Sequence, residues 1–258
     1  LHPFNWRGWW DYGTGALGDM GCHILDAPYK TLGLHYPTDV ECSVSQVFQK
    51  AWNMNFIPAG CPASSIVTLN FDKTAKNDSK IEMIWMDGGL RPSHPEFIPA
   101  DDFLGEENST NGVLMIGETG VISCGVYGLG PKLYRKGQET IEFSTDGHAN
   151  SLDHVHHMEW INGIKGGYGS DEYKKITAPF EYAGPFTETV LMGNLAIRSY
   201  MSMGKDKPKY APNTYSTSEY SKFVGRKKLL WDGDNMKITN FDEANKFVGR
   251  TRRSGWNI

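Results

Sequence analysis

The chain has 258 residues, of which 39% are hydrophobic and 22% are charged, and its formal net charge is −4. This composition is typical of a soluble globular protein with a sizeable core, in one domain or two. The net negative charge argues against a nucleic-acid partner, and no apolar run approaches the roughly 20 residues that a membrane helix needs, so neither kind of partner is expected.

The first element in chain order is a helix that begins near Ala16. Apolar and polar side chains recur along it at helical steps and fall on different faces. The apolar set is Leu17, Met20, Ile24, Pro28 and Leu32, and the polar set is Asp19, His23, Asp26 and Lys30. Pro28 is expected to kink the helix, and Gly33 followed by Pro37 to end it.

Glycines at the start of this helix allow two interpretations. Gly13, Gly15 and Gly18 have the spacing G-x-G-x-x-G of a dinucleotide-binding turn. That turn follows a buried parallel strand, whereas residues 6–12 read Trp-Arg-Gly-Trp-Trp-Asp-Tyr, which is not the apolar run of such a strand. We therefore favour a helix that starts close to a ligand, with Asp19 and His23 pointing at it. A glycine inside a helix costs about 1 kcal/mol relative to alanine, and close approach of a neighbouring backbone or a ligand is the usual reason for it.

Strand-like segments follow the helix. Residues 40–48, 65–71 and 80–86 alternate apolar with polar side chains, which predicts a sheet covered on one side. We expect a polar turn at residues 72–79 and a long loop at residues 88–111. Residues 112–117 and 121–127 are expected to form a hairpin. Residues 133–134 and 140–143 are further strand candidates.

Helices return toward the end of the chain. One is expected from about Ser151 to Lys165, a second from after Pro185 to about Met203, and a short third after Asn240. A helix, then antiparallel strands, then helices predicts an α+β fold: a largely antiparallel open sheet with helices on one face.

Two groups of side chains are candidates for binding. Trp10 and Tyr12 are either core aromatics or a wall that stacks on a sugar ring, whose hydroxyls Arg7, Asp19 and His23 would bind. The second group contains His156 and His157, which either reach the site beside His23 or make hydrogen bonds at the surface. No pair of these histidines has the H-x-x-x-H spacing of a helical zinc site, so no metal is expected.

Residues 7–23 resemble the signature of the glucose–fructose oxidoreductase / inositol dehydrogenase / MocA family, written loosely as G-G-x-x-x-D-x-G-x-H. Gly15, Asp19, Gly21 and His23 match it, while Thr14 replaces one of the paired glycines. Further segments similar to the family are 156–160 with 165–167, 191–198, 231–232 and 254–256. The resemblance spans nearly the whole chain.

Members of this family have an N-terminal Rossmann domain, which binds NAD(P) and carries a lysine in a Glu-Lys-Pro motif, and a C-terminal α+β domain with an open sheet for oligomerisation. This sequence has no Glu-Lys-Pro tripeptide and no Rossmann strand–turn–helix. The resemblance implies that residues 1–258 are one domain for substrate binding and oligomerisation. NAD or NADP would be bound mainly by the missing Rossmann domain, so no cofactor is expected in this fragment, which alone would be inactive.

The resemblance implies an NAD(P)-dependent oxidoreductase acting on a sugar or cyclitol hydroxyl, assembled as a homo-oligomer through the sheet face. His23 would be the general acid/base, a role that suits histidine because its unperturbed pKa is about 6.5, and Asp19 would orient the substrate or His23. The substrate-binding residues would be Arg7, Trp10, Tyr12, His156 and His157. Two alternatives stay open: NAD-dependent glycoside cleavage by oxidation and elimination, and a non-catalytic sugar-binding or dimerisation module.

The cysteines and the start of the sequence leave the compartment open between cytoplasm and periplasm. Four cysteines, Cys22, Cys42, Cys61 and Cys124, are widely spaced without a C-x-x-C pair. That spacing predicts buried free thiols rather than a zinc site or disulfides. Because the sequence begins at Leu1 with neither methionine nor a signal peptide, we expect a fragment or a processed product.

Overall fold

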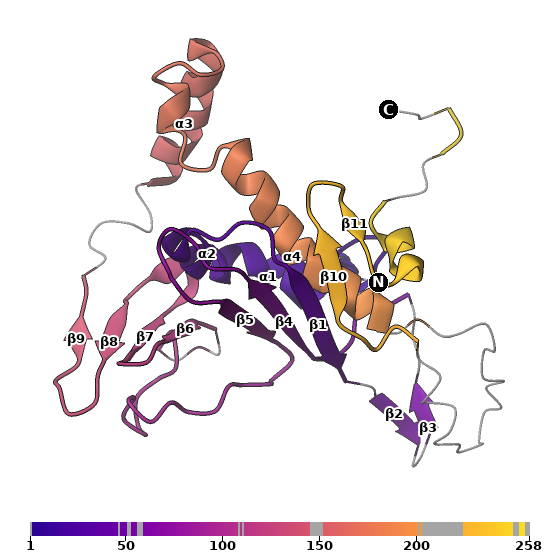
Figure 1. The fold of residues 1–258 in the computed structure, drawn as a ribbon, viewed down its shortest axis with the longest axis horizontal. Coiled ribbons are helices and arrows are strands. Elements are labelled where there is room, and N and C mark those ends of the chain that lie inside the picture. Colours follow the sequence, from indigo (N-terminus) through magenta and orange to yellow (C-terminus); the bar gives the residue numbers. More distant parts are fainter. Residues whose placement is uncertain are drawn as a thin grey trace. The chain divides into compact units, whose positions relative to one another are not determined.

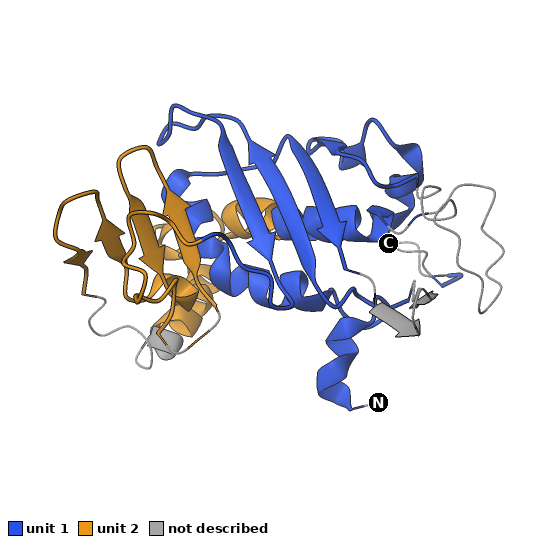
Figure 2. Cartoon of the chain, turned by 90° about the horizontal axis from the view of Figure 1, so that it is seen from below, with its two compact units in different colours: residues 1–93, 188–258 blue, residues 94–187 orange. Residues whose placement is uncertain are grey.

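The computed structural model describes residues 2–45, 47–50, 53–55, 59–107, 109, 111–144, 152–200, 202, 224–249 and 253–255. The chain divides into two compact units (Figure 2): unit 1 comprises Leu1–Ser93 and Glu188–Ile258, and unit 2 comprises His94–Thr187. Both units combine helices with antiparallel strands, so the predicted α+β fold is confirmed. The assignment of residues 1–258 to a single substrate-binding domain stays a prediction.

Unit 1 is built on a five-stranded sheet with the order β11-β10-β1-β4-β5 (Figure 1). Its strands are β1 (Asp39–Val44), β4 (Ser65–Phe71), β5 (Ile81–Met86), β10 (Leu229–Asp232) and β11 (Lys237–Ile238). All of their pairings are antiparallel. Two short strands, β2 (Val47–Lys50) and β3 (Asn53–Asn55), form a separate antiparallel pair.

Strand β4 shows why the helices lie on one face of this sheet. Its side chains alternate between buried and half-buried, and Val67, Leu69 and Phe71 on the inner face are at most 2% exposed. The ring of Tyr29 in α2 (Asp26–Leu32) packs edge-on against Phe71, with centroids 6.4 Å apart. A Cβ added to Gly193 in α4 (Phe180–Tyr200) would lie 3.3 Å from Val67. The buried side chains of β4 therefore form the face of the sheet against which the helices of unit 1 pack.

The predicted first helix is two helices, α1 (Gly15–Ile24) and α2 (Asp26–Leu32), which meet at Leu25. The expected kink is present, but it falls before Pro28 rather than at it. Proline lacks the N–H that would bond the carbonyl four residues earlier, and its ring crowds that carbonyl. The residue four before Pro28 is Ile24, where α1 ends. Gly33 ends α2 as predicted, in the left-handed conformation (φ 64°, ψ 39°).

Helix α4 (Phe180–Tyr200) contains Pro185, although the sequence analysis has this helix start after that proline. The prediction was wrong because the helical turn before Pro185 is held by other contacts. Its Ala183 N–H donates to Pro179 O at 2.8 Å, and the rings of Tyr182 and Phe186 stack with centroids 6.0 Å apart. The predicted end near Met203 lies outside the described residues, and α4 itself ends at Tyr200.

Unit 2 contains a four-stranded antiparallel sheet with the order β6-β7-β8-β9. Its strands are β6 (Val113–Ile116), β7 (Val121–Cys124), β8 (Lys132–Tyr134) and β9 (Ile141–Glu142), which confirms the predicted hairpin and both later strand candidates. Ile98, Val121 and Tyr134 form its small core. The Tyr134 hydroxyl donates to Asp102 at 2.7 Å and so fixes part of the long loop to the sheet. The predicted helix near residue 151 is α3 (Leu152–Gly166).

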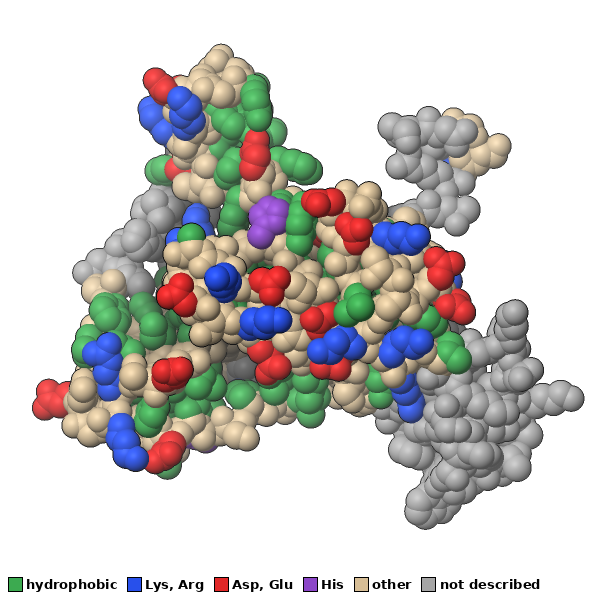
Figure 3. Space-filling view, viewed as in Figure 1, with side chains coloured by type: hydrophobic (Ala, Val, Ile, Leu, Met, Phe, Trp, Pro, Cys, Tyr) green, Lys and Arg blue, Asp and Glu red, His purple; other side chains and the backbone are tan. Residues whose placement is uncertain are grey.

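Short helices complete the fold: η1 (Pro3–Gly8), η2 (Val126–Gly128), η3 (Tyr173–Lys175) and η4 (Asp242–Phe247) are all 3-10 helices. The last is the short helix predicted after Asn240. No helix in the described part of the chain is long and apolar enough to cross a membrane. Acidic and basic side chains are interspersed over the face of unit 1 drawn in Figure 3.

All four cysteines are free, as predicted, but their predicted burial holds fully for Cys124 alone. Cys42 and Cys61 are half-buried and Cys22 is exposed. Cys22 is exposed because it lies on α1 away from the buried positions Leu17, Gly21 and Ile24, a difference that cysteine spacing cannot indicate.

Candidate functional site

The candidate site lies where η1 meets the start of α1. The segment after η1 is held against residues 59–61 by two backbone bonds, from Trp10 N to Ala59 O at 3.0 Å and from Cys61 N to Gly8 O at 2.8 Å. A tight turn then returns the chain, with Gly13 N donating to Trp9 O at 2.8 Å. These bonds bring η1 alongside α1.

Gly13 makes this close approach possible. A Cβ at this position would lie 2.5 Å from the Cα of Arg7 and 2.8 Å from its carbonyl oxygen. Those distances are shorter than any side chain tolerates, so only glycine lets the backbone of η1 pass here. The consequence is that Arg7, in the last turn of η1, reaches α1.

Arg7 and Asp19 form an ion pair across the junction. Arg7 Nη1 donates to Asp19 Oδ2, and Arg7 Nε donates to the carbonyl oxygen of Phe4 at 3.1 Å. The guanidinium also lies over the Phe4 ring, 4.0 Å from its centroid, in a cation–π contact. Both charged side chains are partly exposed, Arg7 at 41% and Asp19 at 31%. The pair is therefore held in a defined geometry and remains accessible from solvent.

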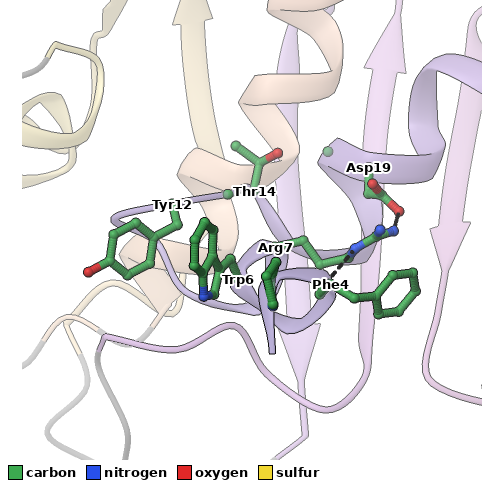
Figure 4. Close-up of a pocket in the computed structure, with 9 residues that line it drawn as sticks. Phe4, Trp6, Arg7, Tyr12, Thr14 and Asp19 are labelled. Atoms are coloured by element: carbon green, nitrogen blue, oxygen red, sulfur yellow. Dashed lines mark hydrogen bonds and ion pairs between the residues drawn. The ribbon is translucent and has the colours of Figure 1, made fainter. Parts of the chain in front are cut away.

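An open pocket of about 430 Å³ surrounds this ion pair, and Figure 4 shows its lining. Trp6 and Tyr12 lie on one side, and on the other the Arg7 guanidinium lies between Asp19 and the Phe4 ring. The remaining lining residues are Pro3, Gly13, Thr14 and Gly18. The Trp6 and Tyr12 rings are 6.0 Å apart with an interplanar angle of 38°. The pocket combines aromatic walls with one paired cation and anion.

Of the residues expected to form the site, Arg7, Tyr12 and Asp19 line the pocket together. His23 does not line it: its side chain is half-buried and lies one helical turn beyond Asp19 on α1. Trp10 does not line it either, because its ring faces the guanidinium of Arg198 in α4, 5.5 Å from the ring centroid. The catalytic role of His23 and the binding role of Trp10 stay predictions.

His156 and His157 belong to unit 2, on α3. Both are exposed, and their rings are 6.3 Å apart. His156 Nδ1 lies 3.4 Å from the Thr177 hydroxyl and 4.0 Å from Glu159 Oε2, and the same glutamate oxygen accepts a bond from the Thr177 hydroxyl at 3.0 Å. The substrate-binding role of His156 and His157 stays a prediction.

Phe4, Trp6 and Thr14 line the pocket although the sequence analysis did not name them as site residues. Trp6 belongs to the aromatic segment before Gly13, and that segment could have indicated Trp6 as a site residue. Phe4 lines the pocket because it contacts Arg7. Thr14 lines it because it is the N-cap of α1, where its side chain makes no capping hydrogen bond. The spacing of residues in the sequence does not indicate that Phe4 or Thr14 lines the pocket.

The motif glycines do not form a dinucleotide cradle. No strand precedes Gly13 among the described residues, where η1 stands instead. A Cβ on Gly15 would lie 3.0 Å from Cys61 Sγ, and one on Gly18 would lie 1.8 Å from the Thr14 hydroxyl oxygen. This chain's own atoms therefore fill the space that a side chain would need at both positions. A helix does begin near Ala16, as predicted, whereas the ligand expected beside it stays a prediction.

In the described residues, no group of three or more histidine, cysteine or acidic side chains could hold a metal ion. Cys61 lies next to the site, with its Sγ 3.9 Å from Arg7 O. Burial raises the pKa of its thiol to about 11, so the group is a neutral thiol rather than a nucleophilic thiolate at neutral pH.

Comparisons with known proteins add no relative: no family model matches the sequence, and no curated protein matches it.

Proposed function

We propose that this chain is the substrate-binding domain of an NAD(P)-dependent oxidoreductase that acts on a hydroxyl group of a sugar or cyclitol. The observation that carries the proposal is the Arg7–Asp19 ion pair, which is exposed in a pocket whose other side is formed by Trp6 and Tyr12. Flat aromatic rings suit the apolar C–H faces of a sugar ring, and the charged pair supplies hydrogen bonds to its hydroxyls. The resemblance of residues 7–23 to the oxidoreductase family supports the same function.

In this proposal α1 supplies the proton chemistry. His23 lies four residues after Asp19, so the two side chains project from one helix face. The His23 imidazole accepts the hydroxyl proton as the carbon is oxidised. Asp19 accepts a hydrogen bond from a neighbouring hydroxyl and fixes the orientation of the ring. A nicotinamide bound by a further domain would supply the hydride acceptor.

The test uses the complete gene product with NAD or NADP and a panel of sugars and cyclitols, followed by NADH or NADPH absorbance. We expect reduced cofactor to form with at least one member of the panel. His23→Ala is expected to lower kcat at least about a hundredfold, the usual contribution of a general acid/base. Cys22→Ala, at an exposed neighbouring position of α1, is the matched control and should leave kcat unchanged.

Unchanged turnover in His23→Ala would contradict the acid/base role. The absence of reduced cofactor with every substrate, in a gene product without a dinucleotide-binding domain, would contradict the oxidoreductase proposal itself.

One observation favours a second function, a non-catalytic sugar-binding module. His23 is not among the pocket-lining residues, whereas the binding groups Arg7, Tyr12 and Asp19 are. A binding module would retain sugar affinity in His23→Ala and in the absence of any nicotinamide cofactor.

The resemblance also leads us to propose that two copies associate through the outer face of the unit 1 sheet. Ile84 and Leu230 lie on that face and are 45% and 43% exposed. They are single exposed apolar side chains on β5 and β10, which β1 and β4 separate, so the resemblance carries this proposal rather than a contiguous apolar patch. Light scattering after size exclusion should give a dimer or a larger oligomer, and Ile84→Glu should give a monomer. A wild-type monomer at micromolar concentration would contradict this.

A further inference from the structure

We propose that the pocket between η1 and α1 selects an uncharged ring bearing two neighbouring hydroxyl groups, and that it discriminates against phosphorylated sugars and sugar acids. This inference rests on the proposed function and names the substrate class for the same site.

The first argument is the charge of the pocket. Arg7 and Asp19 are the only charged residues among the nine that line it, and they are paired with each other. A phosphate or carboxylate that approached Arg7 would have to displace Asp19 or lie beside it. Like charges brought together in this way disfavour the wrong ligand strongly. A site built for an anion would instead present an unpaired arginine.

The second argument is the hydrogen-bonding capacity that the pair leaves unused. Arginine carries five N–H donors in a planar fork, and Arg7 uses its Nε on Phe4 O and its Nη1 on Asp19. In the described part of the chain, Arg7 Nη2 and Asp19 Oδ1 have no hydrogen-bond partner. The ion pair therefore keeps one unused donor and one unused acceptor.

A vicinal diol is the complement of this arrangement. One hydroxyl donates to the Asp19 carboxylate, and its neighbour accepts from the Arg7 guanidinium, since a hydroxyl serves in either role. The contacts that Arg7 makes with Phe4 hold the guanidinium in place without using these groups. A ligand with a single hydroxyl would satisfy only one half of the pair.

The third argument is the shape of the other wall. Trp6 and Tyr12 are 46% and 68% exposed, and their rings lie 6.0 Å apart. Apolar faces of that size suit the C–H face of a six-membered ring. The Thr14 hydroxyl, which makes no capping bond to α1, is a further polar group in the lining. A ring with one apolar face and hydroxyls at its edge offers a matching group to each of these residues.

The experiment is a ligand-observed NMR titration of the chain with four probes. Two are uncharged, methyl α-glucopyranoside and myo-inositol, and two are anionic, glucuronate and glucose 6-phosphate. We expect at least one uncharged probe to bind with a Kd about tenfold or more below that of either anion. A second pair, cis-1,2-cyclohexanediol against cyclohexanol, tests the diol, and the diol should bind more tightly.

Asp19→Asn provides a signature that misfolding cannot imitate. This variant keeps the side-chain shape and leaves the Arg7 charge unpaired. Glucuronate should therefore bind to the variant more tightly than to the wild-type chain, and the uncharged probes should bind to it more weakly. Arg7→Met should shift preference toward glucosamine, because Asp19 is then unpaired. Circular dichroism spectra identical to that of the wild type establish that both variants are folded.

The outcomes separate the two proposals. Binding of the uncharged probes alone, with the preference inverted in Asp19→Asn, supports the inference. Equal or tighter binding of glucuronate or glucose 6-phosphate to the wild-type chain overturns it and leaves the oxidoreductase proposal in place. Failure of every probe, at concentrations up to tens of millimolar, overturns the inference and removes the sugar-binding basis of the proposed function.

Discussion

Helix α1 has two faces whose surroundings differ. The packed face meets α4, where Cβ atoms added to Gly21 and Gly193 would lie 3.1 Å from Val190 and 2.3 Å from Leu17, respectively. The other face carries Asp19 and meets η1 and solvent. The comparison separates two roles within one motif: glycines permit close helix packing, while polar side chains on the opposite face are available to a ligand.

The largest effect is expected on the packed face. Gly193→Val introduces side-chain atoms where Leu17 and Val67 are at most 1% exposed. Overpacking of this kind costs about 1–3 kcal/mol, and each kcal/mol lowers Tm by about 2–4 °C in a protein of this size. Thermal unfolding measures the loss. Gly249→Val is the control, since a Cβ at Gly249 meets nothing within 4 Å; an equal loss in both variants would contradict the packing role of Gly193.

A second prediction concerns two asparagines of unit 1. Asn194 in α4 is 5% exposed, and neither amide atom has a hydrogen-bond partner among the described residues. Asn245 in η4 accepts from Ile238 N at 2.8 Å and donates to Ile238 O at 2.9 Å. Leaving a buried polar group unpaired costs about 1–3 kcal/mol. Asn245→Leu is therefore expected to lower the free energy of unfolding by about that amount.

Asn194→Leu should leave the free energy of unfolding unchanged or raise it, because it removes a desolvated amide that gains nothing from folding. Urea denaturation of both variants measures the difference. A loss above about 1 kcal/mol in Asn194→Leu would instead reveal a partner for its amide, such as an ordered water between α1 and α4.

On the pocket face we expect the opposite result, a substitution that weakens ligand binding but leaves stability nearly unchanged. Trp6→Ala should weaken binding of methyl α-glucopyranoside about two- to tenfold, given the 0.5–1.5 kcal/mol that a specific aromatic contact contributes. Its Tm should stay close to that of the wild type, since Trp6 is 46% exposed. Trp160→Ala, at a 63% exposed position of α3 outside the pocket lining, is the matched control and should bind normally. Equal weakening in both variants would remove Trp6 from the site.

The smallest effect is expected at Cys22, which is exposed on α1. Cys22→Ser should change the free energy of unfolding by less than about 0.5 kcal/mol, the usual limit for a surface substitution. Cys124→Ser, at a 3% exposed position, places a hydroxyl in an apolar site and should cost more. Urea denaturation compares them; equal effects would mean that Cys22 is more constrained than its exposure indicates.

The sequence was sufficient to predict the main elements of the fold. Alternation of side chains located β4 and β5, helical periodicity located α1 with α2, and Gly33 marked the end of α2. The start of α4 was missed because Pro185 is a strong breaker signal that local packing overrides. Strand β3 has only three residues, Asn-Met-Asn, which are too few for their alternation to indicate a strand.

The site was predictable in part. The spacing of Asp19 and His23 places both on α1, and the nearby aromatic segment contributes Tyr12 to the pocket. The approach of η1 to α1 depends on the contact between Gly13 and the Arg7 backbone, which only the folded chain creates. Phe4 and Thr14 join the lining through that approach, so no local pattern could identify them.

The most direct measurement is a crystal structure of the chain soaked with methyl α-glucopyranoside or myo-inositol. We expect a ring against Trp6 and Tyr12, with adjacent hydroxyls within hydrogen-bond distance of Asp19 Oδ1 and Arg7 Nη2. A ring bound elsewhere, with this pocket empty at a ligand concentration that saturates binding in solution, would contradict it.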